Sequence, residues 1–325
     1  MLSFSVAIIL GLIVLVWSAD RFVDGAANLA RNWGVSPFII GVLIVGLGTS
    51  APEMLVSAVA ALEGNPGIGI GNAIGSNITN ISLVLGVTAL MTNLPVRSEI
   101  VKQELPLILC AGLLSWLLMA DHYHGVWDGV ILISCLIAVL SWLTYSSKQQ
   151  QAAIAGDEYL AASMDELPEE LPMNKAVLWT IVGLALLLVS SKALVWGASG
   201  IAVAFGVSDL VVGLTIVAIG TSLPELAASV SSARKGETDL AIGNIVGSNL
   251  FNNLGVLAIP ALIDPGLVPD GVLSRDMPIM IGLTLLLIIL GYGLFSRSRY
   301  QITRSRGALF LSIFVAYQVL LYYQQ

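Results

Sequence analysis

Charged residues are scarce in this chain of 325 amino acids. They make up 11% of the sequence, against about 25% in an ordinary soluble domain. Hydrophobic residues make up 57%. A soluble protein of this composition would need an all-apolar core, and long runs without any charge exclude that interpretation. Such runs cover residues 4–19, 32–51 and 130–147.

Cysteine and histidine are also scarce, with two of each. Cys110 and Cys135 lie inside apolar runs, so we interpret them as buried free thiols rather than a disulfide framework or a thiolate metal site. His122 and His124 form no His-Glu-x-x-His pattern, which argues against an intramembrane metalloprotease. No basic stripe suggests a nucleic acid, no protein partner is evident, and neither a cofactor motif nor a nucleophile–base pair suggests an enzyme.

The apolar runs are long enough to cross a bilayer as helices, which takes about 20 residues. Only helices and closed barrels satisfy their own backbone there, and these runs lack the alternation of barrel strands. The first run lacks a basic region and a cleavage site, so we interpret it as a retained helix. The predicted fold is an all-α polytopic membrane protein. Breaks at glycines, prolines and charge clusters predict ten transmembrane helices, at about 3–24, 37–61, 68–91, 104–120, 126–145, 175–197, 209–233, 240–262, 277–296 and 306–323.

The two halves of the chain are related by a shift of 172 residues. Gly-Thr-Ser-x-Pro-Glu at 48–53 then falls on 220–225, and Gly-Asn-x-x-Gly-Ser-Asn at 71–77 falls on 243–249. Five spans per half place the second half upside down in the membrane, which is the inverted-repeat plan of many transporters. The predicted parts are a first five-helix repeat (1–145), an acidic cytoplasmic linker (146–174) and a second, inverted five-helix repeat (175–325).

Lysines and arginines indicate the orientation. Twelve of them fall in the loops after the first, third, fifth, seventh and ninth spans, and the other side has only Lys192 and Arg275. Such an excess is typical of the cytoplasmic side. We therefore expect a multi-pass protein of the cell (inner or plasma) membrane with both termini on the non-cytoplasmic side.

A glutamate stands in the middle of an apolar span in each half, at Glu53 and Glu225. A carboxylate at membrane depth is costly and normally faces a cavity or an ion pathway. A structural pairing with lysine or arginine is the alternative. It is weak here, because no basic residue lies in the spans that carry the repeated motifs, except the pair at the end of 209–233.

The spacing around each glutamate places several oxygen atoms together. Thr49, Ser50 and Glu53 share a helix face, since residues three and four apart are neighbours. Pro52 and Pro224 lack an amide hydrogen and leave the carbonyls four residues earlier unbonded. Hydroxyl, amide, carboxylate and backbone oxygens suit hard cations such as calcium, whereas zinc or copper would favour His or Cys. The candidate metal ligands are Gly46, Thr49, Ser50, Glu53, Ser76, Asn80, Ala218, Thr221, Ser222, Glu225, Ser248 and Asn252.

Two further asparagines, Asn72 and Asn244, remain ambiguous. An interhelical hydrogen bond is at least as plausible for them as contact with an ion, so we leave them out of the site. The glycines of the same motifs let helices approach closely in lipid.

With both motifs present in both halves, the chain resembles the calcium/cation antiporter superfamily, and most closely its prokaryotic sodium/calcium exchanger branch. The resemblance covers the whole chain. It implies alternating access, exchange of three sodium ions for one calcium ion with net charge movement, and the ligand positions given above. Some relatives, including potassium-dependent exchangers, have Asp where this chain has Asn252, which favours transport independent of potassium.

Two alternatives stay open. The superfamily includes proton-driven cation exchangers, so the coupling ion could be a proton. A cation channel or an ion-sensing membrane protein could use the same site, and counterflow of the two ions distinguishes an antiporter from both. No cofactor is expected beyond the transported calcium and sodium ions, and the lipid bilayer is the expected environment.

Overall fold

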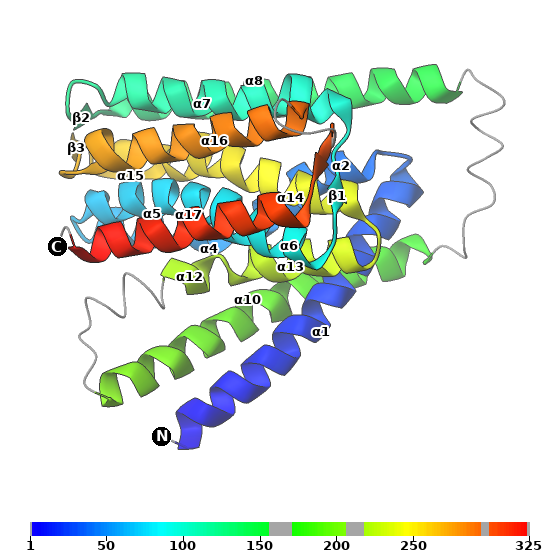
Figure 1. Ribbon diagram of the computed structural model, residues 1–325, viewed down its shortest axis with the longest axis horizontal. Helices are drawn as coiled ribbons and strands as arrows, with labels where there is room; N and C mark the ends of the chain where they lie inside the picture. Colours follow the sequence, from blue (N-terminus) through cyan, green and yellow to red (C-terminus); the bar gives the residue numbers. More distant parts are fainter. Residues whose placement is uncertain (1, 156–170, 206–217, 294–298, 324–325) are drawn as a thin grey trace.

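The computed structural model describes residues 2–155, 171–205, 218–293 and 299–323, and this part is almost entirely helical (Figure 1). Eight of its helices are long and apolar enough to cross a membrane. A ninth candidate is the pair Pro37–Thr49 and Ala51–Leu62, bent by 40°. The predicted helical polytopic membrane protein is confirmed. The count of ten stays a prediction, because the span at 209–233 begins outside the described residues.

The first half contains five helical stretches. They are α1 (Leu2–Trp33); the broken span α2 (Pro37–Ile40), η1 (Gly41–Gly46), α3 (Leu47–Thr49) and α4 (Ala51–Leu62); α5 (Pro66–Thr79), η2 (Asn80–Val84) and α6 (Leu85–Met91); η3 (Ile100–Glu104) and α7 (Leu105–Leu118); and α8 (Val126–Ala155). The η segments are π-helical turns. Pro106 follows η3, and its missing amide hydrogen explains why the turn widens there.

The described part of the second half follows the same order of elements. They are α10 (Met173–Ala204); α12 (Ala218–Thr221) and α13 (Leu223–Arg234); α14 (Thr238–Phe251), η5 (Asn252–Val256) and α15 (Ala258–Ile263); η6 (Val272–Asp276) and α16 (Met277–Tyr292); and α17 (Arg304–Tyr323). The shift of 172 residues carries α4 onto α13, α5 onto α14, η2 onto η5 and η3 onto η6, residue for residue. The internal correspondence therefore extends from the motifs to the helix boundaries.

Two short antiparallel strand pairs join the halves. β1 (Leu94–Pro95) pairs with β4 (Gln301–Ile302), and β2 (Tyr123–His124) pairs with β3 (Gly266–Leu267). The shift of 172 makes β1 and β3 equivalent, yet β3 lies at the left end of Figure 1 and β1 towards the right. Equivalent elements thus point to opposite ends of the bundle.

Three helices extend beyond their predicted ends. α1 continues to Trp33 rather than residue 24, α10 to Ala204 rather than 197, and α8 to Ala155, well into the predicted linker. In α1 the extension buries Ala26 and Ala30, which pack in a cluster with residues of α13 and α14. Packing by tertiary neighbours therefore holds the helix beyond the point where charges end the apolar run.

Close helix packing in the centre depends on glycine. A Cβ built on Gly243 of α14 would lie 2.4 Å from the Phe38 carbonyl oxygen, and one on Gly247 would lie 2.6 Å from that of Val42. Backbones approach each other this closely only where side chains are absent. The equivalent glycines of α5, Gly71 and Gly75, meet nothing within 4 Å among the described residues.

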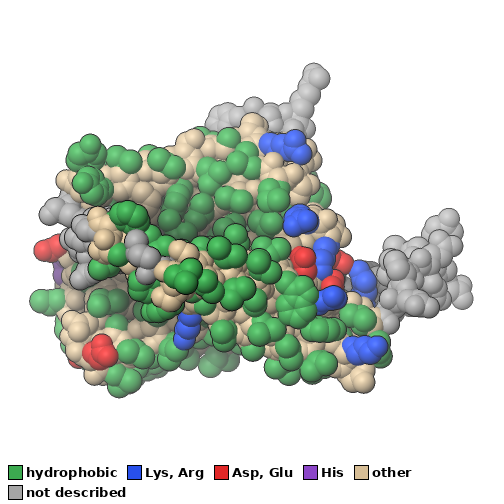
Figure 2. Space-filling model, turned by 90° about the horizontal axis from the view of Figure 1, so that it is seen from below, with side chains coloured by type: hydrophobic (Ala, Val, Ile, Leu, Met, Phe, Trp, Pro, Cys, Tyr) green, Lys and Arg blue, Asp and Glu red, His purple; other side chains and the backbone are tan. Residues whose placement is uncertain are grey.

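The surface agrees with a lipid environment. Hydrophobic side chains cover most of the face in Figure 2, and many of the charged ones gather towards one end. Cys110 is exposed and Cys135 partly buried, and both are free. The prediction that both thiols are buried is therefore wrong for Cys110, because the apolar run that contains it presents one face to the outside of the bundle.

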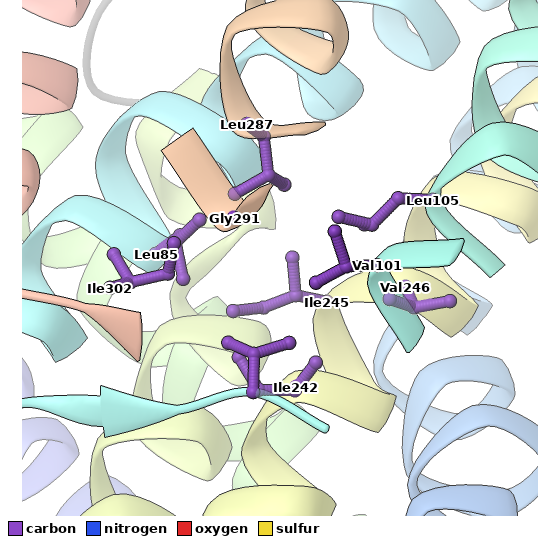
Figure 3. A pocket seen from close by; sticks show the side chains of 10 residues that line it. Leu85, Val101, Leu105, Ile242, Ile245, Val246, Leu287, Gly291 and Ile302 are labelled. Carbon is purple, nitrogen blue, oxygen red and sulfur yellow. The ribbon is translucent and has the colours of Figure 1, made fainter. Parts of the chain in front are cut away.

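A small cavity lies inside the core, and Ile245 and Val246 of the second Gly-Asn-x-x-Gly-Ser-Asn motif form part of its lining. Its volume is about 20 Å³, and Figure 3 shows side chains of η3, α14 and α16 around it, among them Val101, Ile245 and Leu287. Every residue that lines it is apolar. A dry apolar void of this size offers no ligand for a cation, so ion binding must be sought elsewhere.

Candidate functional site

Each Gly-Thr-Ser-x-Pro-Glu segment interrupts its helix at the serine. Ser50 has φ −81° and ψ 1°, and Ser222 has φ −91° and ψ 5°, so both lie just outside helical geometry. Proline stands within the first two residues of the helix that follows, where its missing amide hydrogen would have no partner anyway. The sequence therefore restarts a helix in each half directly before the glutamate.

The two carboxylates occupy the first turns of α4 and α13. Glu53 is 0% exposed and Glu225 1% exposed. A helix N-terminus favours negative charge, yet neither glutamate forms a salt bridge within the described residues. Ser50 Oγ donates to Glu225 Oε1 over 3.4 Å. The other three carboxylate oxygens have no hydrogen-bond partner in the described part of the chain.

The predicted amide ligands show the same lack of partners. Asn80 and Asn252 are both 0% exposed, and neither amide group has a hydrogen-bond partner among the described residues. They begin the π-helical turns η2 and η5. η2 packs against α13, and η5 packs against α4 and α5. Each half therefore places its amide beside the glutamate helix of the other half.

Hydroxyl groups complete the first repeat's side of the site. Thr49 Oγ1 lies 3.4 Å from Ser248 Oγ, and the carbonyl oxygens of Val45 and Gly46 lie 3.0 and 3.4 Å from it. Its single hydrogen can be donated to one of these oxygens or to Oδ1 of Asn244, 3.1 Å away. The Gly46 carbonyl oxygen also accepts a hydrogen bond from Ser248 Oγ over 3.5 Å. This predicted backbone ligand is thus already an acceptor, and binding an ion there would compete with those hydroxyls.

The second repeat's side differs in detail. Ser222 is buried and its hydroxyl has no partner among the described residues, Ser76 is buried, and Thr221 is only partly buried. Ala218 is the first residue of α12. The Gly220 carbonyl, predicted to be left free by Pro224, accepts a hydrogen bond from Ser191 Oγ at 2.9 Å. The residue equivalent to Ser191 in the first half is Ala19, which has no hydroxyl group to donate to the carbonyl of Gly48.

Asn72 and Asn244, which we left out of the predicted set, contact the site's scaffold in matching ways. Asn72 Nδ2 donates to the Glu53 carbonyl oxygen over 3.2 Å and to Ser57 Oγ over 3.4 Å. Asn244 Nδ2 donates to the Glu225 carbonyl oxygen over 3.1 Å and to Ser229 Oγ over 2.8 Å. Asn244 Oδ1 also accepts from Thr49 Oγ1 at 3.1 Å. Their recurrence at the same motif position was the available signal, but the sequence could not show where the amides point.

The arrangement as a whole is a buried, oxygen-rich site with more acceptors than donors. Leaving a buried polar group unsatisfied costs about 1–3 kcal/mol, and more for a charged one. Such groups are rare in native proteins and call for an explanation. A hard cation, which is held by about 6–8 oxygen ligands, would satisfy carboxylates, amide oxygens and hydroxyls together.

The fold is that of a polytopic membrane protein, and the two halves meet at a buried cluster of oxygen atoms that lack hydrogen-bond partners among the described residues. The sequence profile of the sodium/calcium exchanger protein family matches residues 3–145 and 175–323. The chain therefore belongs to the sodium/calcium exchanger family, within the calcium/cation antiporters, and is a cation/calcium antiporter rather than an enzyme.

Known proteins resemble it over almost its whole length. CaxA from Alkalimonas amylolytica is 46% identical over 322 residues, which cover 99% of each chain. The inner membrane protein YrbG of Escherichia coli is 38% identical over 99% of this chain and 98% of its own. Among solved structures, the sodium-calcium exchanger NCX_Mj superimposes with a TM-score of 0.81 at 32% identity, over 97% of both chains.

Proposed function

We propose that this antiporter exchanges calcium for sodium by alternating access, electrogenically and without potassium. The ions bind at the carboxylates of Glu53 and Glu225, at the side-chain oxygens of the other polar predicted ligands and at the backbone oxygens of Gly46 and Ala218. The observation that carries the proposal is the pair of buried glutamates with three unpartnered oxygens and no basic counter-charge in the described part of the chain. The sodium/calcium exchange named for NCX_Mj supports it.

Charge balance explains why one ion would be exchanged for the other. Two carboxylates neutralise one calcium ion or are shared by sodium ions, and they do not hold both loads at once. An empty site leaves two buried anions without partners, which is costly in a medium of low dielectric constant. The carrier therefore crosses with one kind of ion or the other, and this competition couples their fluxes.

The proposed transmembrane arrangement is ten spans in two inverted repeats, with both termini on the non-cytoplasmic side. It is supported by the matching helix boundaries of the two halves and by the placement of the equivalent strands β1 and β3 towards opposite ends of the bundle. A transporter of this plan exposes a midplane site to either side by moving one part of the bundle against the other.

The test is calcium uptake into proteoliposomes under three separate conditions: loaded with sodium, loaded with potassium, or carrying an outward proton gradient without either ion. Uptake only into sodium-loaded vesicles, with the membrane potential responding to turnover, supports electrogenic sodium exchange. Equal uptake driven by protons without sodium would replace sodium by the proton as the coupling ion. Calcium entry that needs no outward gradient of any cation would contradict antiport and indicate a channel.

A further inference from the structure

Polar bonds tie the long helix α1 to the end of α13. Ser231 Oγ donates to Asp20 Oδ1 over 2.5 Å. Lys235, the C-cap residue of α13, donates from Nζ to Asp24 Oδ1 over 2.7 Å and to the Asp20 carbonyl oxygen over 2.5 Å. Arg21 lies 3.9 Å from the other carboxylate oxygen of Asp24, and none of the predicted ion ligands is among the residues bonded here.

The equivalent positions in the other half carry the opposite charges. The shift of 172 residues takes Asp20 of α1 onto Lys192 of α10, and it takes Lys235 onto Glu63. Glu63 is the C-cap residue of α4, just as Lys235 is that of α13. Lys235 touches Asp20 at its backbone carbonyl oxygen and forms its ion pair with the neighbouring Asp24. In the other half the two contacting positions carry Lys192 and Glu63, whose opposite charges would let the side chains themselves pair.

In this structure the second pair is not formed. α1 packs along α13, whereas α10 has no comparable packing against α4. Lys192 and Glu63 are exposed, and neither makes a salt bridge to any described residue. The two halves, although equivalent in sequence order, therefore differ at these positions.

We propose that Lys192 and Glu63 form an ion pair when the transporter faces the opposite side, and that the contact between α1 and Lys235 opens at the same time. The inference rests on the proposed alternating access. If the two halves exchange conformations, α10 comes to lie against α4 as α1 now lies against α13. Each pair then holds one end of the bundle closed in one of the two states.

The two contacts are unequal, which predicts a preferred resting state. Ser231 and Asp24 strengthen the contact seen here, and their equivalents are Val59 and Trp196, which offer no carboxylate or hydroxyl. The state described here therefore has more polar bonds between the long helix and the cap. Removing Lys235 should shift the population towards the state with the Lys192–Glu63 pair.

Cross-linking tests the approach of the two positions directly. Glu63→Cys and Lys192→Cys are combined in a background without Cys110 and Cys135, and disulfide formation by a mild oxidant is followed in proteoliposomes. We expect a cross-link that forms about two- to fivefold faster when Lys235→Ala is added, the size expected for an exposed ion pair. No cross-link in either background, or the same rate in both, would overturn the proposal.

Charge reversal gives a second readout. Glu63→Lys and Lys192→Glu alone should each slow sodium-driven calcium uptake about two- to fivefold, and the double variant should restore it. Asp270→Asn, which alters another exposed acid, serves as the control and should leave the rate unchanged. If Lys192 only reached towards the membrane surface, the double variant would be no better than the singles. Failure of the unmodified protein to exchange calcium for sodium would instead contradict the proposed function, and the cross-linking result would still decide whether positions 63 and 192 approach each other.

Discussion

The hydroxyl of Thr49 donates a hydrogen bond to Oδ1 of Asn244 over 3.1 Å, although 195 positions separate the two residues in the chain. The same asparagine holds the Glu225 carbonyl oxygen through its amide nitrogen. One side chain thus connects the helix break of the first repeat to the glutamate helix of the second. Asn244 is a positioning residue for two proposed ligands, and Ser229 Oγ accepts a further hydrogen bond from its amide nitrogen.

Asn244→Ala should weaken calcium binding without abolishing transport. Loss of a hydrogen bond typically costs about 0.5–1.5 kcal/mol, so we expect the KM for calcium to rise about two- to tenfold with a smaller effect on the maximal rate. Ser229→Ala is the matched control, because it removes one partner of Asn244 and leaves the bonds to Thr49 and Glu225. Equal effects of the two variants on KM would show that Asn244 serves helix packing alone.

Glu53→Gln and Glu225→Gln should each abolish sodium-driven calcium uptake while a folded protein remains in the membrane. Each change removes one of the two charges that would balance a divalent ion, and an amide cannot replace it. Uptake of radioactive calcium into vesicles measures the effect, with Asp270→Asn as the control for loss of an exposed carboxylate. Normal exchange by either glutamine variant would mean that the ion site lies elsewhere.

Asn252→Asp should change the ions that drive transport. Asn252 is fully buried and would place a third carboxylate beside the two glutamates. Added negative charge favours an additional monovalent cation or a proton, so we expect potassium or pH to affect the rate of the variant but not that of the original protein. Potassium stimulation of the unaltered protein would show that its two glutamates already require that ion.

Gly243→Ala should destabilise the fold more than Gly282→Ala. A methyl group on Gly243 would lie 2.4 Å from the Phe38 carbonyl oxygen, whereas Gly282 of α16 is exposed and has no described atom within 4 Å of an added Cβ. Overpacking of this kind costs about 1–3 kcal/mol. Thermal unfolding of the two detergent-solubilised variants makes the comparison, and equal midpoints would contradict the close approach of α14 to η1.

Single cysteines at Arg234 and His122 should label from opposite sides of the membrane, with His122 on the non-cytoplasmic side. Both residues are exposed, so an impermeant thiol reagent can reach them once Cys110 and Cys135 have been replaced. The asymmetric distribution of lysine and arginine is the physical reason. Labelling of both positions from one side would refute the inverted arrangement.

Much of the fold and most of the proposed site follow from local chemistry. A run of apolar residues long enough to cross a bilayer has to be helical there. Pro52 and Pro224 lack an amide hydrogen, from which we predicted free carbonyls within continuous spans; the structure goes further and interrupts both helices, at Ser50 and Ser222.

Other features depend on neighbours that are distant in the chain. The α1 helix continues to Trp33 because its last turns pack against other helices, and the Gly220 carbonyl, predicted to be free, is bonded by Ser191 from α10. The matching bonds of Asn72 and Asn244 were likewise undecided, because an asparagine in a motif suits an ion as well as a carbonyl.

The sequence by itself determined that the chain is a bundle of membrane helices in two related halves, and that each half contributes a glutamate with oxygen-bearing neighbours. The length of the apolar runs, the chemistry of proline and the internal repeat suffice for this. The first two depend only on residues close in the chain, and the repeat is found by aligning the two halves of the sequence. Only the tertiary structure decided which helices of the two repeats contact each other. Gly243 packs tightly against α2 and η1, and Lys235 is bonded to α1, while Lys192 and Glu63 do not contact each other. Two halves with the same motifs can pack differently, because a long-range contact depends on both of its partners and on the conformational entropy lost in bringing them together. Local helix propensity depends only on nearby residues and is therefore the same in both halves.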